Sequence, residues 1–454
     1  MSTIAAISTP QAAGGTAMIR ISGEYALQIA KQVFSPLSTD RLPTEMDGYT
    51  AAYGKIHDGE AHIDDGVLLV FRAPRSYTGE DVAEITCHGG VLIARRVLRA
   101  CINAGAVMAQ PGEFTRRALL AGKLTLTQAE AVADMINIRS DQYLRCSNAQ
   151  REGALFRKIQ EIKQCILDIT VQIAAWIDYP DEGLDSFETS SHLGQLTDCQ
   201  LKLRLLLESY DVGRLMREGI RTAIAGKPNV GKSTLMNLLA GCERSIVTDI
   251  AGTTRDVVEE SVMLGGVLLN IADCAGIRQT DDPVEKIGVM RAEAELEAAE
   301  LVLAVFDNSR PLETEDFFLI EKLRGKNSLC IINKSDLENK LDMAYLATQF
   351  GNVIEISATD NTSLTKLDKA AGRLLKLSRL DISAGFIANE RQRECVIKAE
   401  KALDEAVAGI NAGITMDATG MLLEKALEHL AELTGESVSE TVISEVFSRF
   451  CVGK

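Results

Sequence analysis

The sequence predicts a multidomain fold that combines an α+β N-terminal domain, an all-α helical domain and an inserted α/β domain with a mostly parallel sheet. Short apolar runs alternate with helical patterns between residues 220 and 377, as in parallel strands joined by crossover helices. Apolar residues recur at helical spacing on both sides of this stretch, whereas residues 1–120 mix Gly-rich turns with strand-like runs. We therefore expect domain segments 1–120, 121–216, 217–376 and 377–454, with the second and fourth forming one discontinuous helical domain.

Hydrophobic periodicity supports each of these elements. Residues 66–71 and 82–87 are apolar runs that predict strands in the N-terminal domain. The stripes that predict buried helix faces are Ala129, Val132, Ala133, Ile136, Ile159, Ile162, Ile166, Ile169 and Ile173, and later Val396, Ala399, Leu403, Val407, Leu422, Leu423, Ala426, Leu427 and Leu430. The turn-forming residues 179–183 predict the end of one of these helices.

Bulk composition excludes several classes of protein. The chain has 454 residues, of which 46% are hydrophobic and 25% charged, as expected of a globular protein with two to four domains. Its ten cysteines are scattered without a CxxC pair, so we expect reduced thiols. No apolar run is long enough to span a bilayer, so we expect a cytoplasmic protein with no membrane association. A net charge of −16 argues against coating nucleic acid with a general positive field, so any RNA contact must use a local patch.

The strongest chemical signal lies at residues 226–233, Gly-Lys-Pro-Asn-Val-Gly-Lys-Ser. This pattern is typical of a loop whose backbone N–H groups surround phosphate oxygens, and the apolar run 220–225 precedes it as a strand should. The predicted nucleotide contacts here are Asn229, Val230, Gly231, Lys232, Ser233 and Thr234. Lys232 supplies a positive charge and Ser233 a Mg²⁺ ligand.

A second signal is Asp273-Cys274-Ala275-Gly276, after two apolar runs joined by the pair Gly265-Gly266. A carboxylate at this position can hold Mg²⁺ through water, and the Gly276 N–H can approach a γ-phosphate.

Base specificity is predicted from Asn333, Lys334 and Asp336, which follow the apolar run 329–332. The Asp336 carboxylate can accept both N–H donors of guanine, a pairing that adenine cannot reproduce. Ser357, Ala358 and Thr359 follow another strand, where a backbone amide would meet the guanine oxygen. Four elements in this order predict GTP as the bound nucleotide.

Hydrolysis needs a group that orients water, and the residue after Gly276 is Ile277, which cannot do so. Glu285, a little further along, is the candidate catalytic residue. The alternative is that Glu285 is a solvated carboxylate at the start of a helix.

A family resemblance rests on several motifs. Residues 246–256, Ile-Val-Thr-Asp-Ile-Ala-Gly-Thr-Thr-Arg-Asp, together with Asn229, resemble the TrmE-Era-EngA branch of GTPases. Residues 76–84, 88–90, 111–116 and the ending Phe-Cys-Val-Gly-Lys resemble the MnmE/TrmE family, over the whole chain. The resemblance implies a Ras-like G domain in which further nucleotide contacts come from Thr248, Asp249, Ile250, Ala251, Gly252, Thr253 and Thr254. It also implies that Thr254 joins Ser233 in holding Mg²⁺.

The resemblance further implies the reaction. A homodimer joins an FAD-dependent partner of the MnmG (GidA) type in a heterotetramer, which adds an aminomethyl-type group at C5 of the wobble uridine of certain tRNAs. The one-carbon unit comes from a tetrahydrofolate, as the 5-formyl or 5,10-methylene derivative. The family pattern assigns its site to Arg20, Glu84, Lys123 and Lys454. Arg and Lys suit the folate carboxylates, whereas a Glu can pair with the pterin N–H groups.

Two residues carry open alternatives. The resemblance implies a K⁺ ion, which would be held by the Asn229 carboxamide together with carbonyl groups of Thr248, Ile250 and Thr253. The alternative is that the Asn229 side chain only forms hydrogen bonds with the backbone of its own loop. Cys451 is a nucleophile or acid in the one-carbon chemistry, or it is packed beside Phe450.

Three functions follow: a tRNA-modifying GTPase, an RNA-binding switch GTPase of the Era or EngA kind, and a nucleotide-gated scaffold. Era-type proteins append an RNA-binding module after the G domain, whereas this chain returns to helices. That difference favours the modifying enzyme.

Overall fold

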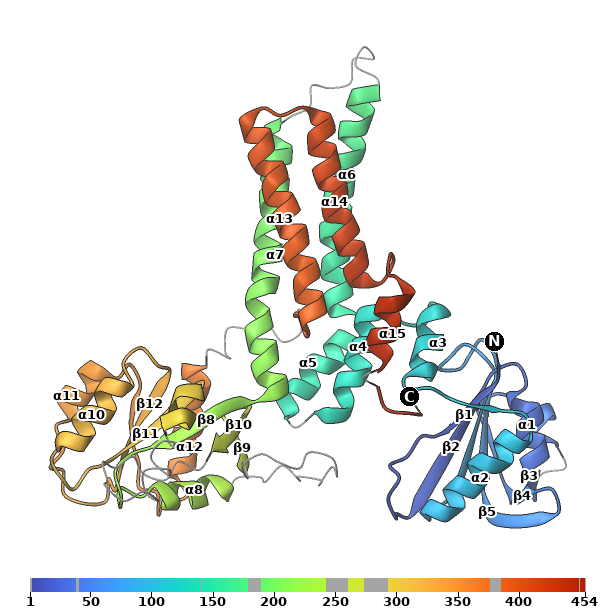
Figure 1. Ribbon diagram of the computed structural model, residues 1–454, viewed down its shortest axis with the longest axis horizontal. Helices are drawn as coiled ribbons and strands as arrows, with labels where there is room; N and C mark the ends of the chain where they lie inside the picture. Colours follow the sequence, from blue (N-terminus) through green and yellow to red (C-terminus); the bar gives the residue numbers. More distant parts are fainter. Residues whose placement is uncertain are drawn as a thin grey trace. The chain divides into compact units, whose positions relative to one another are not determined.

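The computed structural model describes residues 2–37, 41–138, 140–178, 189–241, 260–272, 293–375, 385–448 and 450–453 (Figure 1). The chain divides into two compact units. One unit comprises Met1–Ile136, Gln150–Gln200 and Cys395–Lys454, and the other comprises Asn137–Ala149 and Leu201–Glu394.

A seven-stranded sheet forms the N-terminal domain. Its strands are β1 (Ile4–Ile7), β2 (Thr16–Ser22), β3 (Phe34–Pro36), β4 (Thr50–Asp58), β5 (Ala61–Phe71), β6 (Val82–His88) and β7 (Val107–Met108). The order is β3-β4-β5-β6-β2-β1-β7, antiparallel except for the parallel pair β1–β7. Helices α1 (Ala26–Val33) and α2 (Val91–Asn103) pack against the sheet, and a 3₁₀ turn, η1, spans Pro43–Glu45. The two predicted runs lie in β5 and β6, and alternate residues such as Leu68 and Ile85 are fully buried.

The helical region begins with α3 and α4. The helices are α3 (Glu113–Leu120), α4 (Leu126–Asp134), α5 (Asp141–Arg151), α6 (Ala154–Asp178), α7 (Thr189–Glu218), α13 (Glu390–Ala412), α14 (Met416–Thr434) and α15 (Glu440–Ser448), and the 3₁₀ turn η2 spans Met135–Asn137. Thr125 caps α4 in a capping box with Gln128, which satisfies the free N–H groups of its first turn. Because α4 ends at Asp134, Ile136 falls beyond the helix and is 40% exposed, so the prediction that it continues the buried stripe was wrong.

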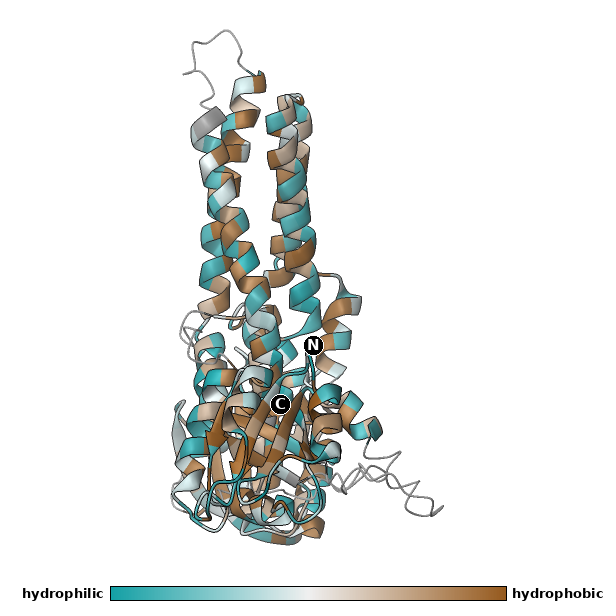
Figure 2. Cartoon of the chain, turned by 90° about the vertical axis from the view of Figure 1, so that its left-hand side faces the viewer, coloured by the Kyte–Doolittle hydropathy of each residue, from teal (hydrophilic) through white to brown (hydrophobic). Residues whose placement is uncertain are grey.

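The long helices bury the predicted apolar stripes. In α6 all five isoleucines of the stripe are buried, and α14, which packs against this helix, buries Leu423, Ala426 and Leu430. Figure 2 shows hydrophobic and hydrophilic residues alternating along these helices, as an amphipathic pattern requires. Residues 179–183, predicted to end a helix, lie outside the described residues.

The inserted α/β domain has a six-stranded sheet in the order β13-β12-β11-β8-β10-β9. Its strands are β8 (Ile220–Ala225), β9 (Glu260–Leu264), β10 (Val267–Ala272), β11 (Leu301–Asp307), β12 (Ser328–Asn333) and β13 (Val353–Glu355), and its helices are α8 (Lys232–Ala240), α10 (Thr314–Lys322), α11 (Met343–Gln349) and α12 (Ser363–Leu374). All pairs are parallel except β9–β10, whose turn residues Gly265 and Gly266 have positive φ of 63° and 83°. Every residue of β11 is buried, as in a parallel strand covered on both faces.

The predicted fold class is therefore confirmed: an α+β domain, a helical region and an inserted α/β domain with a mostly parallel sheet. Among the described helices, none combines the length and hydropathy that crossing a bilayer requires.

Candidate functional site

The loop between β8 and α8 has the geometry that a phosphate site requires. Gly226 has φ of 157°, and a Cβ there would meet the Val305 carbonyl oxygen at 2.5 Å. Gly231 has φ of 99°, and a Cβ there would meet the Asn333 side chain at 2.1 Å. Neither position accepts a side chain, so the glycines are required by backbone conformation and by space.

Lys232 begins α8 and folds back over this loop. Its Nζ donates to the carbonyl oxygens of Gly226 at 2.7 Å and Lys227 at 2.8 Å. Ser233 and Thr234 follow in the first turn of α8 and are exposed. The Val230 side chain, also in this loop, is buried. The helix N-terminus and this ammonium group together form an anion-binding arrangement.

Asn229 has the left-handed backbone conformation, with φ of 64°, which is uncommon outside glycine. Its main-chain oxygen accepts a hydrogen bond from Lys334 Nζ at 2.9 Å. Within the described part of the chain, its exposed carboxamide makes no hydrogen bond, so the alternative that this side chain caps its own loop finds no support.

Asn333 connects three loops at one edge of the sheet. Its Nδ2 donates to the Val230 oxygen at 2.9 Å, and its Oδ1 accepts from the Ala358 N–H at 2.9 Å. Ser357 and Thr359 bond to each other through their hydroxyl groups at 2.9 Å. The structure thus brings the predicted base-recognition segments to the phosphate loop.

Lys334 lies beside Asp336 on the loop after β12. Its Nζ donates to Asp307 Oδ2 at 2.6 Å, and its φ is 62°. Burial acts to raise the pKa of Asp307, but hydrogen bonds from Lys334 and Ser309 lower it below the ordinary value. The Asp336 carboxylate is exposed and has no hydrogen-bond or ion-pair partner among the described residues, so it is accessible to a base.

Many candidate residues lie outside the described residues. These are Thr248, Asp249, Ile250, Ala251, Gly252, Thr253, Thr254, Asp273, Cys274, Ala275, Gly276, Glu285 and Lys454. Their predicted roles stay predictions.

A second cluster surrounds Arg20 in the N-terminal domain. Arg20 and Glu84 are cross-strand partners on β2 and β6, and Nε of Arg20 donates to the Glu84 carboxylate at 2.7 Å. The guanidinium carbon lies 6.0 Å from the ring centroid of Tyr77 and 5.6 Å from that of Phe114. Two aromatic rings and an ion pair therefore share one small region.

This pairing disfavours separate roles for Arg20 and Glu84 at opposite ends of an elongated ligand. The two side chains are bonded to each other, so they face the same part of a ligand. Lys123 approaches the loop after β5, where its Nζ donates to the Pro74 oxygen at 2.6 Å. The same loop carries Tyr77, whose ring lies near Arg20, so Lys123 and Arg20 both lie next to this loop.

The C-terminal segment docks on this domain. Val452 forms a β-bridge with Pro111, and the Ser8 hydroxyl donates to the Gly453 oxygen at 3.1 Å. Arg20 Nη1 lies 3.5 Å from the same oxygen. Gly453 has φ of 100°, and a Cβ there would meet the Ile7 oxygen at 2.4 Å, so this seat requires glycine.

Cys451 is exposed, whereas Phe450 is buried against Phe447 and Ala129. The alternative that the Cys451 side chain is packed in the core beside Phe450 is therefore wrong, because Phe450 is buried and Cys451 is not. Of the cysteines that the structure describes, Cys451 alone is exposed. Burial raises the pKa of Cys101 and Cys330 to about 12, which leaves those thiols inert.

Sequence reasoning missed Tyr77, Phe114 and Asp307. The first two lie inside the quoted motifs, and only their packing around Arg20 gives them a role. Asp307 ends β11 at the carboxyl edge of a parallel sheet, where ligands bind in such folds, and that position was a usable signal.

Comparisons with known proteins match the whole chain. A family model described as the MnmE helical domain matches residues 126–451, and one described as the GTP-binding protein TrmE N-terminus matches residues 3–123. A tRNA modification GTPase MnmE from Lactiplantibacillus plantarum is 39% identical, covering 100% of this chain and 98% of that protein. A tRNA modification GTPase MnmE from Latilactobacillus sakei is 40% identical, covering 100% of this chain and 98% of that protein. A tRNA modification GTPase MnmE from Thermoanaerobacter pseudethanolicus is 39% identical, covering 100% of this chain and 99% of that protein.

Proposed function

Because this chain belongs to the MnmE family of tRNA modification GTPases, we propose that it couples GTP hydrolysis to modification of the wobble uridine in certain tRNAs. The product is an aminomethyl or carboxymethylaminomethyl group at uridine C5. The chain acts as a cytoplasmic homodimer with an FAD-dependent partner of the MnmG type and with tRNA.

The α/β domain binds GTP in this proposal. Lys232 and the N-terminus of α8 hold the phosphates, and Asp336 selects guanine. Ser233 and Thr254 hold Mg²⁺. The Asn229 carboxamide, free of other partners among the described residues, fits a K⁺ ligand that Thr248, Ile250 and Thr253 complete. Glu285 orients the water.

The N-terminal domain holds a tetrahydrofolate derivative in this proposal. The group supplies the one-carbon unit when bound. Arg20 and Glu84 offer charged hydrogen-bond partners to one end, and Tyr77 and Phe114 offer ring surfaces beside them. Lys123 and Lys454 extend the cationic set toward carboxylates, and the exposed Cys451 thiol lies in the docked tail as a nucleophile or acid.

One observation carries this proposal: the C-terminal segment docks beside Arg20. Residues 445 positions apart in the chain, Ser8 and Gly453, are hydrogen-bonded, and Arg20 approaches the same carbonyl oxygen. Cys451 belongs to this docked tail, which supports a role for its thiol in the same part of the domain as Arg20.

Nucleoside analysis of tRNA from a deletion strain tests the function. Complementation with the wild-type gene restores the wobble modification, whereas Arg20→Ala and deletion of Lys454 do not, although both proteins hydrolyse GTP normally. Arg99→Ala is the matched control, because Arg99 is an exposed arginine of the same domain on α2. Unmodified wobble uridines should appear in the deletion strain; if its wobble uridines match the parent's, the proposed function is wrong.

A further inference from the structure

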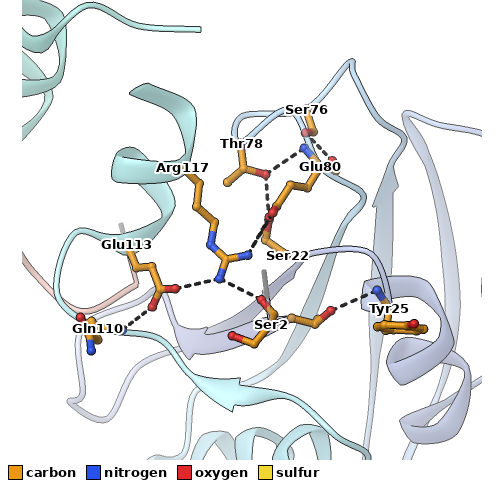
Figure 3. Close-up of polar contacts among 10 residues, drawn as sticks. Ser2, Ser22, Tyr25, Ser76, Thr78, Glu80, Gln110, Glu113 and Arg117 are labelled. Atoms are coloured by element: carbon orange, nitrogen blue, oxygen red, sulfur yellow. Dashed lines mark hydrogen bonds and ion pairs between the residues drawn. The ribbon is translucent and has the colours of Figure 1, made fainter. Parts of the chain in front are cut away.

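Arg117 on α3 is a buried cation at the centre of a polar network (Figure 3). Its side chain is 5% exposed. Nη1 donates to both oxygens of Glu80 at 3.0 Å, and Nη2 donates to Glu113 at 2.7 Å and to the Ser2 carbonyl oxygen at 2.9 Å. One guanidinium therefore joins three separate parts of the N-terminal domain.

The Glu80 carboxylate fixes the loop that follows β5. Ser22 at the end of β2 donates to Glu80 at 2.7 Å, and Thr78 accepts from the Glu80 N–H at 3.3 Å. The Ser22 and Thr78 hydroxyl groups lie 2.7 Å apart. Figure 3 shows Glu80 reaching the Arg117 guanidinium from the loop, with Thr78 and Ser22 bonded around Glu80.

The Glu113 carboxylate fixes the start of α3. It accepts from the Gln110 N–H at 2.8 Å as well as from Arg117 one turn later. Glu113 also places a negative charge in the first turn of α3, where the helix dipole favours it.

The two segments that Arg117 joins are the two that flank Arg20. The loop carries Tyr77 and the helix carries Phe114, and their rings lie on the Arg20 guanidinium. The Tyr77 hydroxyl also bonds to Thr115 of α3 at 2.9 Å. The spacing between the rings therefore depends on how the loop and the helix are held together.

We propose that Arg117 is a positioning residue for the N-terminal ligand site: with one carboxylate from each segment, it sets the gap between Tyr77 and Phe114 around Arg20. This inference rests on the proposed folate function, whose ligand would enter that gap. Arg117 itself does not touch the ligand.

Only arginine suits this position. Its planar fork offers five donors in fixed directions, so it reaches two carboxylates and a carbonyl group at once. A lysine keeps the charge but has one nitrogen atom, which cannot occupy all the donor positions. Arg117→Lys therefore loosens one or both segments while leaving a cation for the two carboxylates.

The test uses the full-length protein and three variants. Arg117→Lys removes the fork, Glu80→Gln weakens only the loop connection, and Ile56→Val is the matched control, a small destabilising change in the buried centre of the same sheet. Three properties are measured for each: affinity for 5-formyltetrahydrofolate by calorimetry, thermal unfolding, and amide hydrogen exchange of segments 73–81 and 113–116.

Arg117→Lys should weaken folate binding about tenfold, as loss of a supporting contact does at other sites, with unchanged GTP hydrolysis. Exchange should accelerate in both segments for Arg117→Lys and only in 73–81 for Glu80→Gln. Ile56→Val should lower the unfolding temperature without changing either folate affinity or exchange in these segments.

Two results would overturn the positioning role. One is an Arg117→Lys protein with wild-type folate affinity, or with a loss no larger than that of an equally destabilised control. The other is an Arg117→Lys protein with unchanged hydrogen exchange in both segments. That result would exclude the positioning role even if the wild-type protein binds no folate. Failure of the wild-type protein to bind folate counts instead against the proposed function.

Discussion

The two candidate sites hold their cations in different ways. In the nucleotide site the Lys232 ammonium group rests on backbone carbonyl oxygens at 2.7 and 2.8 Å. In the N-terminal domain Arg20 and Arg117 are bonded to carboxylates at 2.7 to 3.0 Å. A carbonyl oxygen is a neutral hydrogen-bond acceptor, whereas a carboxylate neutralises the guanidinium group with which it pairs. We therefore expect the Lys232 ammonium group to exchange these neutral acceptors for phosphate oxygens, and a ligand of the N-terminal domain to depend more on position and directed hydrogen bonds.

Removing the Lys232 charge gives the largest expected effect. Lys232→Met should lower the rate of GTP hydrolysis about a thousandfold, because it deletes a preorganised charge from the phosphate site. Steady-state phosphate release measures this, with Lys369→Met, an exposed lysine on α12, as the control. A rate within a few-fold of wild type would show that Lys232 does not act on the phosphates.

Base recognition sharpens the comparison, because Asp336 is an exposed carboxylate with no partner among the described residues. Asp336→Asn should weaken GTP binding about a hundredfold and improve xanthosine triphosphate binding, since one acceptor for guanine N–H groups is lost. Competition binding with both nucleotides measures the change. Unaltered affinities for both would contradict the assignment.

The Asn229 carboxamide tests whether a metal ion supplements Lys232. GTP hydrolysis by the wild-type protein should be about tenfold faster in K⁺ than in Na⁺, because the ion neutralises charge between the β- and γ-phosphates. Asn229→Ala should lose this difference and still bind GTP. Equal wild-type rates in the two salts would exclude the K⁺ mechanism.

In the second site, position is tested through Gly453. Gly453→Ala should weaken binding of 5-formyltetrahydrofolate several-fold, roughly fivefold, because the new Cβ collides with the Ile7 oxygen and lifts the tail. Gly413→Ala is the matched control, since Gly413 also has positive φ, 74°, but has nothing within 4 Å of a Cβ. Carboxypeptidase digestion measures release of the C-terminal tail independently. Equal digestion of the two variants would show that the contact between Gly453 and Ile7 does not hold the tail in place.

The smallest effect concerns the Lys334–Asp307 pair. The depressed pKa of Asp307 means that the pair stabilises the fold at neutral pH and that this contribution is lost as the pH falls through the folded-state pKa. Asp307→Asn should cost about 1 kcal/mol at pH 7, and the difference from wild type should narrow near pH 3. Denaturant unfolding at the two pH values gives both numbers, and a gap that widens in acid would reverse the assignment.

Local sequence was sufficient to predict the backbone geometry of the loop at residues 226–233. Residues 226–233 follow a buried strand and begin a helix, so their backbone geometry is set by neighbours along the chain. The same holds for the Gly265-Gly266 turn and for the buried stripe of α6, because turn conformation and helical spacing are short-range properties.

By itself, then, the sequence determined the fold class, the order of the nucleotide motifs and the family resemblance. Tertiary structure decided that Arg20 pairs with Glu84, that Cys451 is exposed while Phe450 is buried, and that Gly453 is seated on β1. The Arg20–Glu84 and Ser8–Gly453 hydrogen bonds, for example, join residues 64 and 445 positions apart. No local preference encodes them, because they form only when separate segments bury their apolar faces together and leave their polar groups opposite one another.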